Sequence, residues 1–87
     1  MGKVERAVIE ALVRATEGGA AFVAEKDLQA VARAAGGRGK AADFAIRRLV
    51  RRGLLASQWN GTTYKEDTRI GYRPTAKAYD ELRDGAG

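Results

Sequence analysis

Residues 38–52 read RGKAADFAIRRLVRR. Wound as a helix at about 100° per residue, this stretch has two unlike faces. One face is apolar and carries Ala42, Ala45, Ile46, Leu49 and Val50. The other face carries Lys40, Phe44, Arg47, Arg48 and Arg51. The pattern predicts an amphipathic helix that is anchored in a core on one side and presents cations on the other.

The positive charge of the protein is concentrated in this stretch. It holds six of the sixteen Lys and Arg residues and one of the eleven acidic residues, Asp43, so the other 72 residues hold ten of each. The formal net charge of +5 therefore belongs to residues 38–52. A cationic stripe on one helix face is typical of a surface that meets phosphates, although a solvated helix face gives the same pattern.

The composition argues against several function classes. The chain of 87 residues is long enough for one domain. It has no cysteine, which excludes thiol chemistry and thiolate metal sites. It also has no histidine, the commonest general base and the commonest transition-metal ligand. Ser57 is the only serine, and no pair of carboxylates stands out. We therefore expect no catalytic, metal-binding or cofactor-binding residues, no enzyme activity and no small-molecule ligand.

The hydropathy pattern also argues against a membrane protein. No apolar run approaches the ~20 residues of a membrane span. Glu5 and Glu10 interrupt the apolar run near the start, so no signal peptide is expected there. We expect a soluble, cytoplasmic protein.

Helical spacing predicts four helices, at about 3–16, 25–35, 39–52 and 76–83. In the first helix, Ile9 and Val13 form a second apolar ridge beside the main one. This ridge is either part of the core or part of a dimer contact. In the last helix, Tyr79 and Leu82 are expected to face inward, and Thr75 is expected to cap the helix.

The region of about 54–73 predicts a β-hairpin. We favour strands at about 54–59 and 69–73 joined by a long loop, with Pro74 ending the second strand. The alternative is a tight turn at Asn60-Gly61 followed by a third short strand. Residues 20–23, AAFV, form either a very short strand or an extended connector.

This order of elements is the winged helix-turn-helix layout, and two motifs carry the resemblance. Residues 47–55, RRLVRRGLL, resemble the end of the recognition helix and the start of the wing in transcriptional regulators of the PadR and MarR type. Residues 72–77, YRPTAK, resemble the Tyr-x-Leu-Thr-x-Lys-Gly segment that follows the wing, with Pro74 in place of Leu and Ala78 in place of Gly. The resemblance covers about residues 3–83. It implies one α+β, mostly helical winged-helix domain over residues 1–87, with a three-helix core, a two-stranded wing and a C-terminal helix.

The resemblance also implies sequence-specific binding of double-stranded DNA, with the third helix in the major groove and wing residues 60–69 on the backbone or in the minor groove. Residues near the start of such a helix reach base edges, and later ones divide between bases and phosphates. The expected DNA-binding residues are Arg38, Lys40, Phe44, Arg47, Arg48 and Arg51 on the helix, with Lys65 and Arg69 on the wing. Phe44 either meets thymine methyl groups or packs into the core.

Regulators with this layout bind paired half-sites, so we expect a homodimer, formed through Ile9, Val13, Tyr79 and Leu82. Two alternative functions stay open. The broad apolar surface of the first helix fits a winged-helix protein-interaction module in a larger complex. The aromatics Trp59, Tyr64 and Tyr72 beside cations fit a binder of single strands or RNA, although such residues more often pack a sheet against helices.

Overall fold

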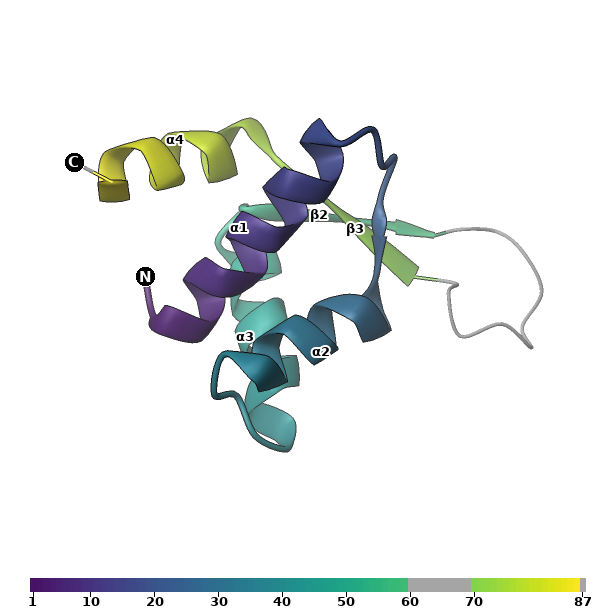
Figure 1. Ribbon diagram of the computed structural model, residues 1–87, viewed down its shortest axis with the longest axis vertical. Helices are drawn as coiled ribbons and strands as arrows, with labels where there is room; N and C mark the ends of the chain where they lie inside the picture. Colours follow the sequence, from purple (N-terminus) through teal and green to yellow (C-terminus); the bar gives the residue numbers. More distant parts are fainter. Residues whose placement is uncertain (60–69, 87) are drawn as a thin grey trace.

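Four helices and three strands form the described part of the chain (Figure 1). The structure is a computed structural model, which describes residues 1–59 and 70–86. In chain order, the elements are α1 (Lys3–Glu17), β1 (Val23–Ala24), α2 (Glu25–Ala34), α3 (Lys40–Arg51), β2 (Leu55–Trp59), β3 (Ile70–Pro74) and α4 (Ala76–Ala86). The fold is α+β and mostly helical, as predicted, and the element bounds lie close to the expected ones except that α4 continues to Ala86.

The sheet has three strands in the order β1-β3-β2 with antiparallel neighbours. The segment at 20–23, expected as a very short strand or an extended connector, leads into a two-residue strand at Val23–Ala24. β2 and β3 form the expected ladder, from Leu55 opposite Pro74 to Trp59 opposite Ile70. β1 pairs with the free edge of β3, with Ala24 opposite Gly71. Gly71 permits this arrangement because a β-carbon at that position would collide with the Phe22 ring just before β1.

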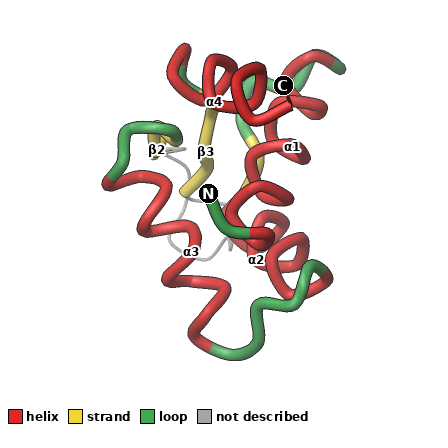
Figure 2. The backbone as a smooth tube through the Cα atoms, turned by 90° about the vertical axis from the view of Figure 1, so that its left-hand side faces the viewer, coloured by secondary structure: helices red, strands yellow, loops and turns green. Residues whose placement is uncertain are grey.

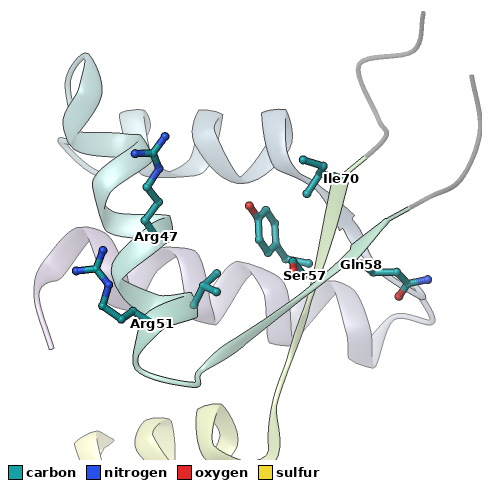
Figure 3. A pocket seen from close by; sticks show the side chains of 7 residues that line it. Arg47, Arg51, Ser57, Gln58 and Ile70 are labelled. Atoms are coloured by element: carbon teal, nitrogen blue, oxygen red, sulfur yellow. The ribbon is translucent and has the colours of Figure 1, made fainter. Parts of the chain in front are cut away.

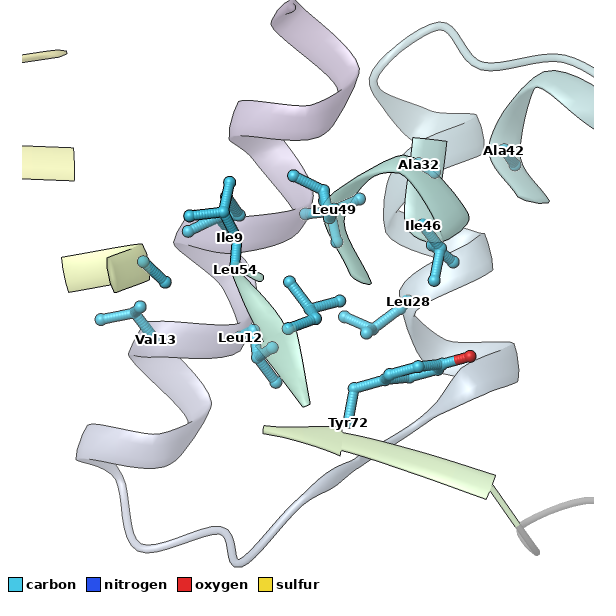
Figure 4. Close-up of a cluster of buried hydrophobic side chains, with 13 residues drawn as sticks. Ile9, Leu12, Val13, Leu28, Ala32, Ala42, Ile46, Leu49, Leu54 and Tyr72 are labelled. Carbon is cyan, nitrogen blue, oxygen red and sulfur yellow. The ribbon is translucent and has the colours of Figure 1, made fainter. Parts of the chain in front are cut away.

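A single cluster of buried side chains joins α1, α2, α3 and the sheet (Figure 4). Leu28 of α2 and Leu49 of α3 are fully buried in it. Ile9 and Val13 of α1 also belong to it, which assigns the second ridge of the first helix to the core. Their predicted place in a dimer contact is therefore wrong, because the chain's own core already covers them. Tyr79 and Leu82 of α4 are partly buried against the cluster, as expected.

The end of α3 sets the direction in which the chain enters the sheet. The backbone amide of Gly53 donates to the carbonyl of Val50 (3.0 Å), and that of Leu54 donates to the carbonyl of Leu49 (2.9 Å). Gly53 has φ of +80°, which an L side chain rarely adopts. The helix therefore ends just before this glycine, and β2 follows directly beside α3.

Thr75 directly precedes α4, at the position predicted for the helix cap, and its hydrogen bonds also reach back to the turn after α3. Its hydroxyl donates to the carbonyl of Gly53 (2.6 Å) and lies 3.2 Å from that of Leu54, while its backbone amide donates to Leu54 (3.1 Å). Thr75 therefore ties the start of α4 to the turn that follows α3. Lys77 adds a second link, because its Nζ donates to the carbonyl of Arg52 (2.9 Å).

Candidate nucleic-acid interface

α3 runs along one edge of the molecule, with α2 and α1 on its inner side (Figure 2). Its apolar face is anchored as predicted, since Ala42, Ala45, Ile46 and Leu49 are buried and Val50 is partly buried. The opposite face is open to solvent. Its exposed residues are Lys40, Phe44, Arg47, Arg48 and Arg51, and Arg38 is exposed in the preceding turn. All six predicted helix-side residues are therefore exposed, and four of them, Phe44, Arg47, Arg48 and Arg51, line one hollow.

The one acid of α3, Asp43, lies at the border of this exposed face, one turn before Arg47, and the two residues line a small hollow. Asp43 is half-buried, and its Oδ1 accepts a hydrogen bond from Nε2 of Gln29 on α2 (2.6 Å). A charge-assisted bond of this kind fixes the carboxylate between the two helices. The middle of the exposed face of α3 consequently carries cations and one aromatic ring, with the carboxylate of Asp43 at its border.

Phe44 is the apolar residue of this face. Its side chain is 51% exposed, so the alternative that it packs into the core is wrong. It lies in a shallow hollow of about 320 Å³, which is lined by Ala41, Phe44, Arg47, Arg48 and Arg51.

A larger groove of about 620 Å³ separates α3 from the β2–β3 ladder (Figure 3). It is lined by Arg47, Val50, Arg51, Ser57, Gln58, Ile70 and Tyr72. Arg47 and Arg51 extend from successive turns of α3 on the same side, while Gln58 and Ile70 lie on the strands opposite (Figure 3). The groove thus combines an apolar lining with two guanidinium groups and two neutral polar side chains.

Tyr72 forms part of the lining of this groove and is only 7% exposed. Its hydroxyl donates to Oε2 of Glu25 at the start of α2 (2.7 Å). Burial, followed by this hydrogen bond and the charge of Glu25, raises the pKa of Tyr72 well above its ordinary value of about 10, while Arg47 partly opposes the shift. The neutral hydroxyl therefore links β3 to α2 beneath the groove.

The arginines of α3 and its C-cap fall into two groups. Arg47 and Arg51 make no ion pair with an acid in the described part of the chain. Arg48 and the C-cap residue Arg52 both lie near the Glu5 carboxylate of α1, and Arg52 also lies 3.6 Å from Glu81 of α4. Arg48 nonetheless keeps 59% of its side chain exposed.

Some predicted residues are not placed. Lys65, Arg69 and Tyr64 lie outside residues 1–59 and 70–86, and the Trp59 side chain is likewise not described. The sequence reasoning missed Glu5, Gln29, Ser57 and Gln58 as neighbours of the site. The helical spacing of Glu5 could have indicated its inward direction, because Glu5 precedes Leu12 by seven residues and shares a face with it.

Within the described residues, no group of three or more acidic residues is arranged to hold a metal ion. None of the helices there combines the length and the apolar character needed to cross a bilayer. No protein-family model, no curated protein and no solved structure matches the chain.

Proposed function

We propose that the chain is a winged helix-turn-helix protein that binds double-stranded DNA sequence-specifically and regulates transcription. In this proposal α3 enters the major groove, and the wing contacts the backbone or the minor groove through Lys65 and Arg69. The proposal includes a cytoplasmic location. It does not include catalysis or a cofactor.

The observation that carries the proposal is the composition of the exposed face of α3. Lys40, Arg47, Arg48 and Arg51 are exposed there, while the one acid of α3, Asp43, is half-buried and bonded to Gln29. Arg47 and Arg51 have no acidic partner among the described residues, so their charges are available to a polyanion. Four exposed cations with one half-buried acid leave this face strongly positive, and such a face attracts phosphates.

The lining of the groove between α3 and the β2–β3 ladder also supports the proposal of DNA binding. A DNA strand that runs between α3 and the hairpin would meet Arg47 and Arg51 with its phosphates. The apolar lining formed by Val50, Ile70 and Tyr72 would face its sugars. Ser57 and Gln58 supply further hydrogen-bond donors on the strand side.

One alternative loses the feature that motivated it, and the other loses one of its three aromatics. The apolar ridge of α1 that suggested a protein-interaction module is buried within the chain. Tyr72, one of the three aromatics that suggested base stacking, is buried and bonded to Glu25. Competition between duplex and single strand for the protein tests the second alternative directly.

We further propose a homodimer that binds paired half-sites about one helical turn apart. Of the four residues first expected at the dimer contact, only Tyr79 and Leu82 of α4 retain accessible surface for it. Sedimentation equilibrium with and without duplex DNA tests the dimer. A monomer that occupies a single half-site would contradict the proposed homodimer.

The experiment for DNA binding uses two charge-matched double variants. Arg47→Ala/Arg51→Ala removes two cations from the exposed face of α3, and Arg6→Ala/Arg14→Ala removes two from α1. Fluorescence anisotropy with a duplex selected from a random library gives the dissociation constants. Two lost phosphate contacts should weaken binding about 10- to 100-fold, since a charged hydrogen bond is worth roughly 1.5–3 kcal/mol at most and less at a wet surface.

The α1 variant should lose much less affinity, because only the long-range part of the electrostatic attraction changes. Circular dichroism shows whether each variant keeps its helices. Equal losses in the two variants would mean that net charge alone attracts DNA, and the assignment of the interface to α3 would then be wrong.

A further inference from the structure

Phe44 is the most exposed aromatic among the side chains that the structure describes, and it stands in the middle of a cationic face. Exposure of half a phenyl ring is unfavourable in water, at about 25 cal/mol for each Å² of apolar surface. Every other large apolar side chain of α3 is buried or partly buried. We therefore expect the exposed Phe44 ring to be covered by a binding partner.

The neighbours of Phe44 define what that partner must look like. Ala41 lies one turn before it on the same face, while Arg47 and Arg48 lie one turn after it. The hollow therefore has an apolar centre with cations along its rim. Its occupant must be anionic overall and must offer a small apolar group between its charges.

Duplex DNA meets both conditions at one kind of position. The base edges in the major groove carry hydrogen-bond donors and acceptors, and the single apolar group among them is the 5-methyl group of thymine. Phe44 is the fifth residue of α3, within the first half of the helix, which is the half that reaches base edges when a helix enters the groove.

We propose that Phe44, with Ala41 beside it, is a specificity-determining residue that selects thymine in the major groove by enclosing its 5-methyl group. This proposal rests on the proposed DNA-binding function and adds the base that the helix reads. Arg47 and Arg51 supply affinity through phosphates, whereas Phe44 supplies sequence preference.

The test replaces thymine by deoxyuridine, which removes the methyl group and leaves every hydrogen bond of the base pair in place. A duplex is first selected from a random library, and each thymine in it is then replaced singly. At the positions that Phe44 reads, the loss of one buried methyl group should weaken binding about fourfold. The other positions should show no change.

Three variants assign the effect to its residue. Phe44→Ala should bind the thymine and deoxyuridine duplexes equally well, whereas Phe44→Leu should keep most of the preference because it keeps an apolar side chain. Arg51→Ala should weaken both duplexes by the same factor and leave their ratio unchanged. Phe44 is half exposed, so the thermal unfolding of its variants should resemble that of the parent chain.

Each other outcome overturns the proposal. Equal affinity of the parent chain for all thymine and deoxyuridine duplexes would show that no methyl group is read. A ratio that persists in Phe44→Ala would assign the reading to another residue. Tight duplex binding without any selected consensus would leave DNA binding intact and remove the thymine preference, whereas failure to bind any duplex would overturn the proposed function as well.

Discussion

The carboxylate of Glu5 on α1 lies 4.0 Å from the guanidinium of Arg48 on α3, measured from Oε2 to Nε. Glu5 is only 8% exposed, and this oxygen has no hydrogen-bond partner among the described residues. Nη1 of Arg52 lies 3.8 Å from the same Oε2 atom of Glu5. A nearly buried anion is thus held by two cations at the edge of the face that we assign to DNA, and it offsets part of their charge.

Replacing Glu5 by Gln should therefore raise the affinity for duplex DNA. The substitution keeps the shape of the side chain and frees Arg48 from its anionic partner, while Arg52 keeps its contact with Glu81. We expect a gain of about twofold to fivefold, since a partly exposed ion pair is worth roughly 0.2–1 kcal/mol. Glu10→Gln is the matched control, because Glu10 lies on the same helix and pairs with Arg6 instead. Equal gains in affinity in the two variants would mean that the change in net charge alone causes the effect, and not the release of Arg48.

Arg51 and Arg52 are neighbours in the chain that should behave differently. Arg51 has no ionic partner in the described part of the chain, so Arg51→Ala should remove one phosphate contact and reduce the slope of log affinity against log salt by about 0.9. Arg52 is shared between Glu5 and Glu81, so Arg52→Ala should change that slope less. Salt titrations of the two single variants make the comparison, and a larger effect for Arg52 would contradict it.

The buried hydroxyl of Tyr72 makes the stability sensitive to alkaline pH. Its pKa is raised in the folded state, so the stability that it contributes is complete below the ordinary tyrosine pKa of about 10. As the pH rises above 10, the unfolded chain releases this proton while the folded chain retains it, and the free energy of unfolding falls. Urea unfolding at pH 8 and at pH 10.5 measures the change.

Tyr72→Phe is the control for this pH dependence. It should cost about 1 kcal/mol at pH 8, through loss of the hydrogen bond to Glu25. It should also flatten the alkaline decline. An equally steep decline in the variant would show that other groups cause it.

Gly71 should be intolerant of a side chain. Gly71→Ala places a β-carbon against the ring of Phe22, so β1 and β3 would have to move apart. We expect a loss of about 1–3 kcal/mol in the free energy of unfolding, which is typical of overpacking. Gly18→Ala is the matched control, because a β-carbon there lies 3.4 Å from the carbonyl oxygen of Ala15, an ordinary contact. Similar stability of the two variants would contradict the close approach of Phe22.

The elements that repeat a pattern over many residues were predictable from the sequence. Ala42, Ala45, Ile46 and Leu49 recur at helical spacing, and this spacing alone predicts both the buried and the exposed face of α3. The end of α3 at Gly53 was also predictable, because a glycine after the last helical turn is a local signal in the sequence.

Contacts between distant residues were not predictable in this way. β1 is two residues long, and its pairing with β3 depends on the fit of Phe22 over Gly71, which no periodicity encodes. The ion pair of Glu5 with Arg48 and the bond of Gln29 to Asp43 join different helices, so helix spacing alone does not reveal them. The expected wing contacts of Lys65 and Arg69 lie outside the described residues and stay predictions.

The most direct test of the central claim is the salt dependence of duplex binding by the parent chain between 50 and 200 mM salt, the range over which phosphate contacts are lost most visibly. If about four cations around α3 neutralise phosphates, the slope of log affinity against log salt should be about −3 to −4. An affinity that does not change with salt, or no binding at the lowest salt, would contradict the account.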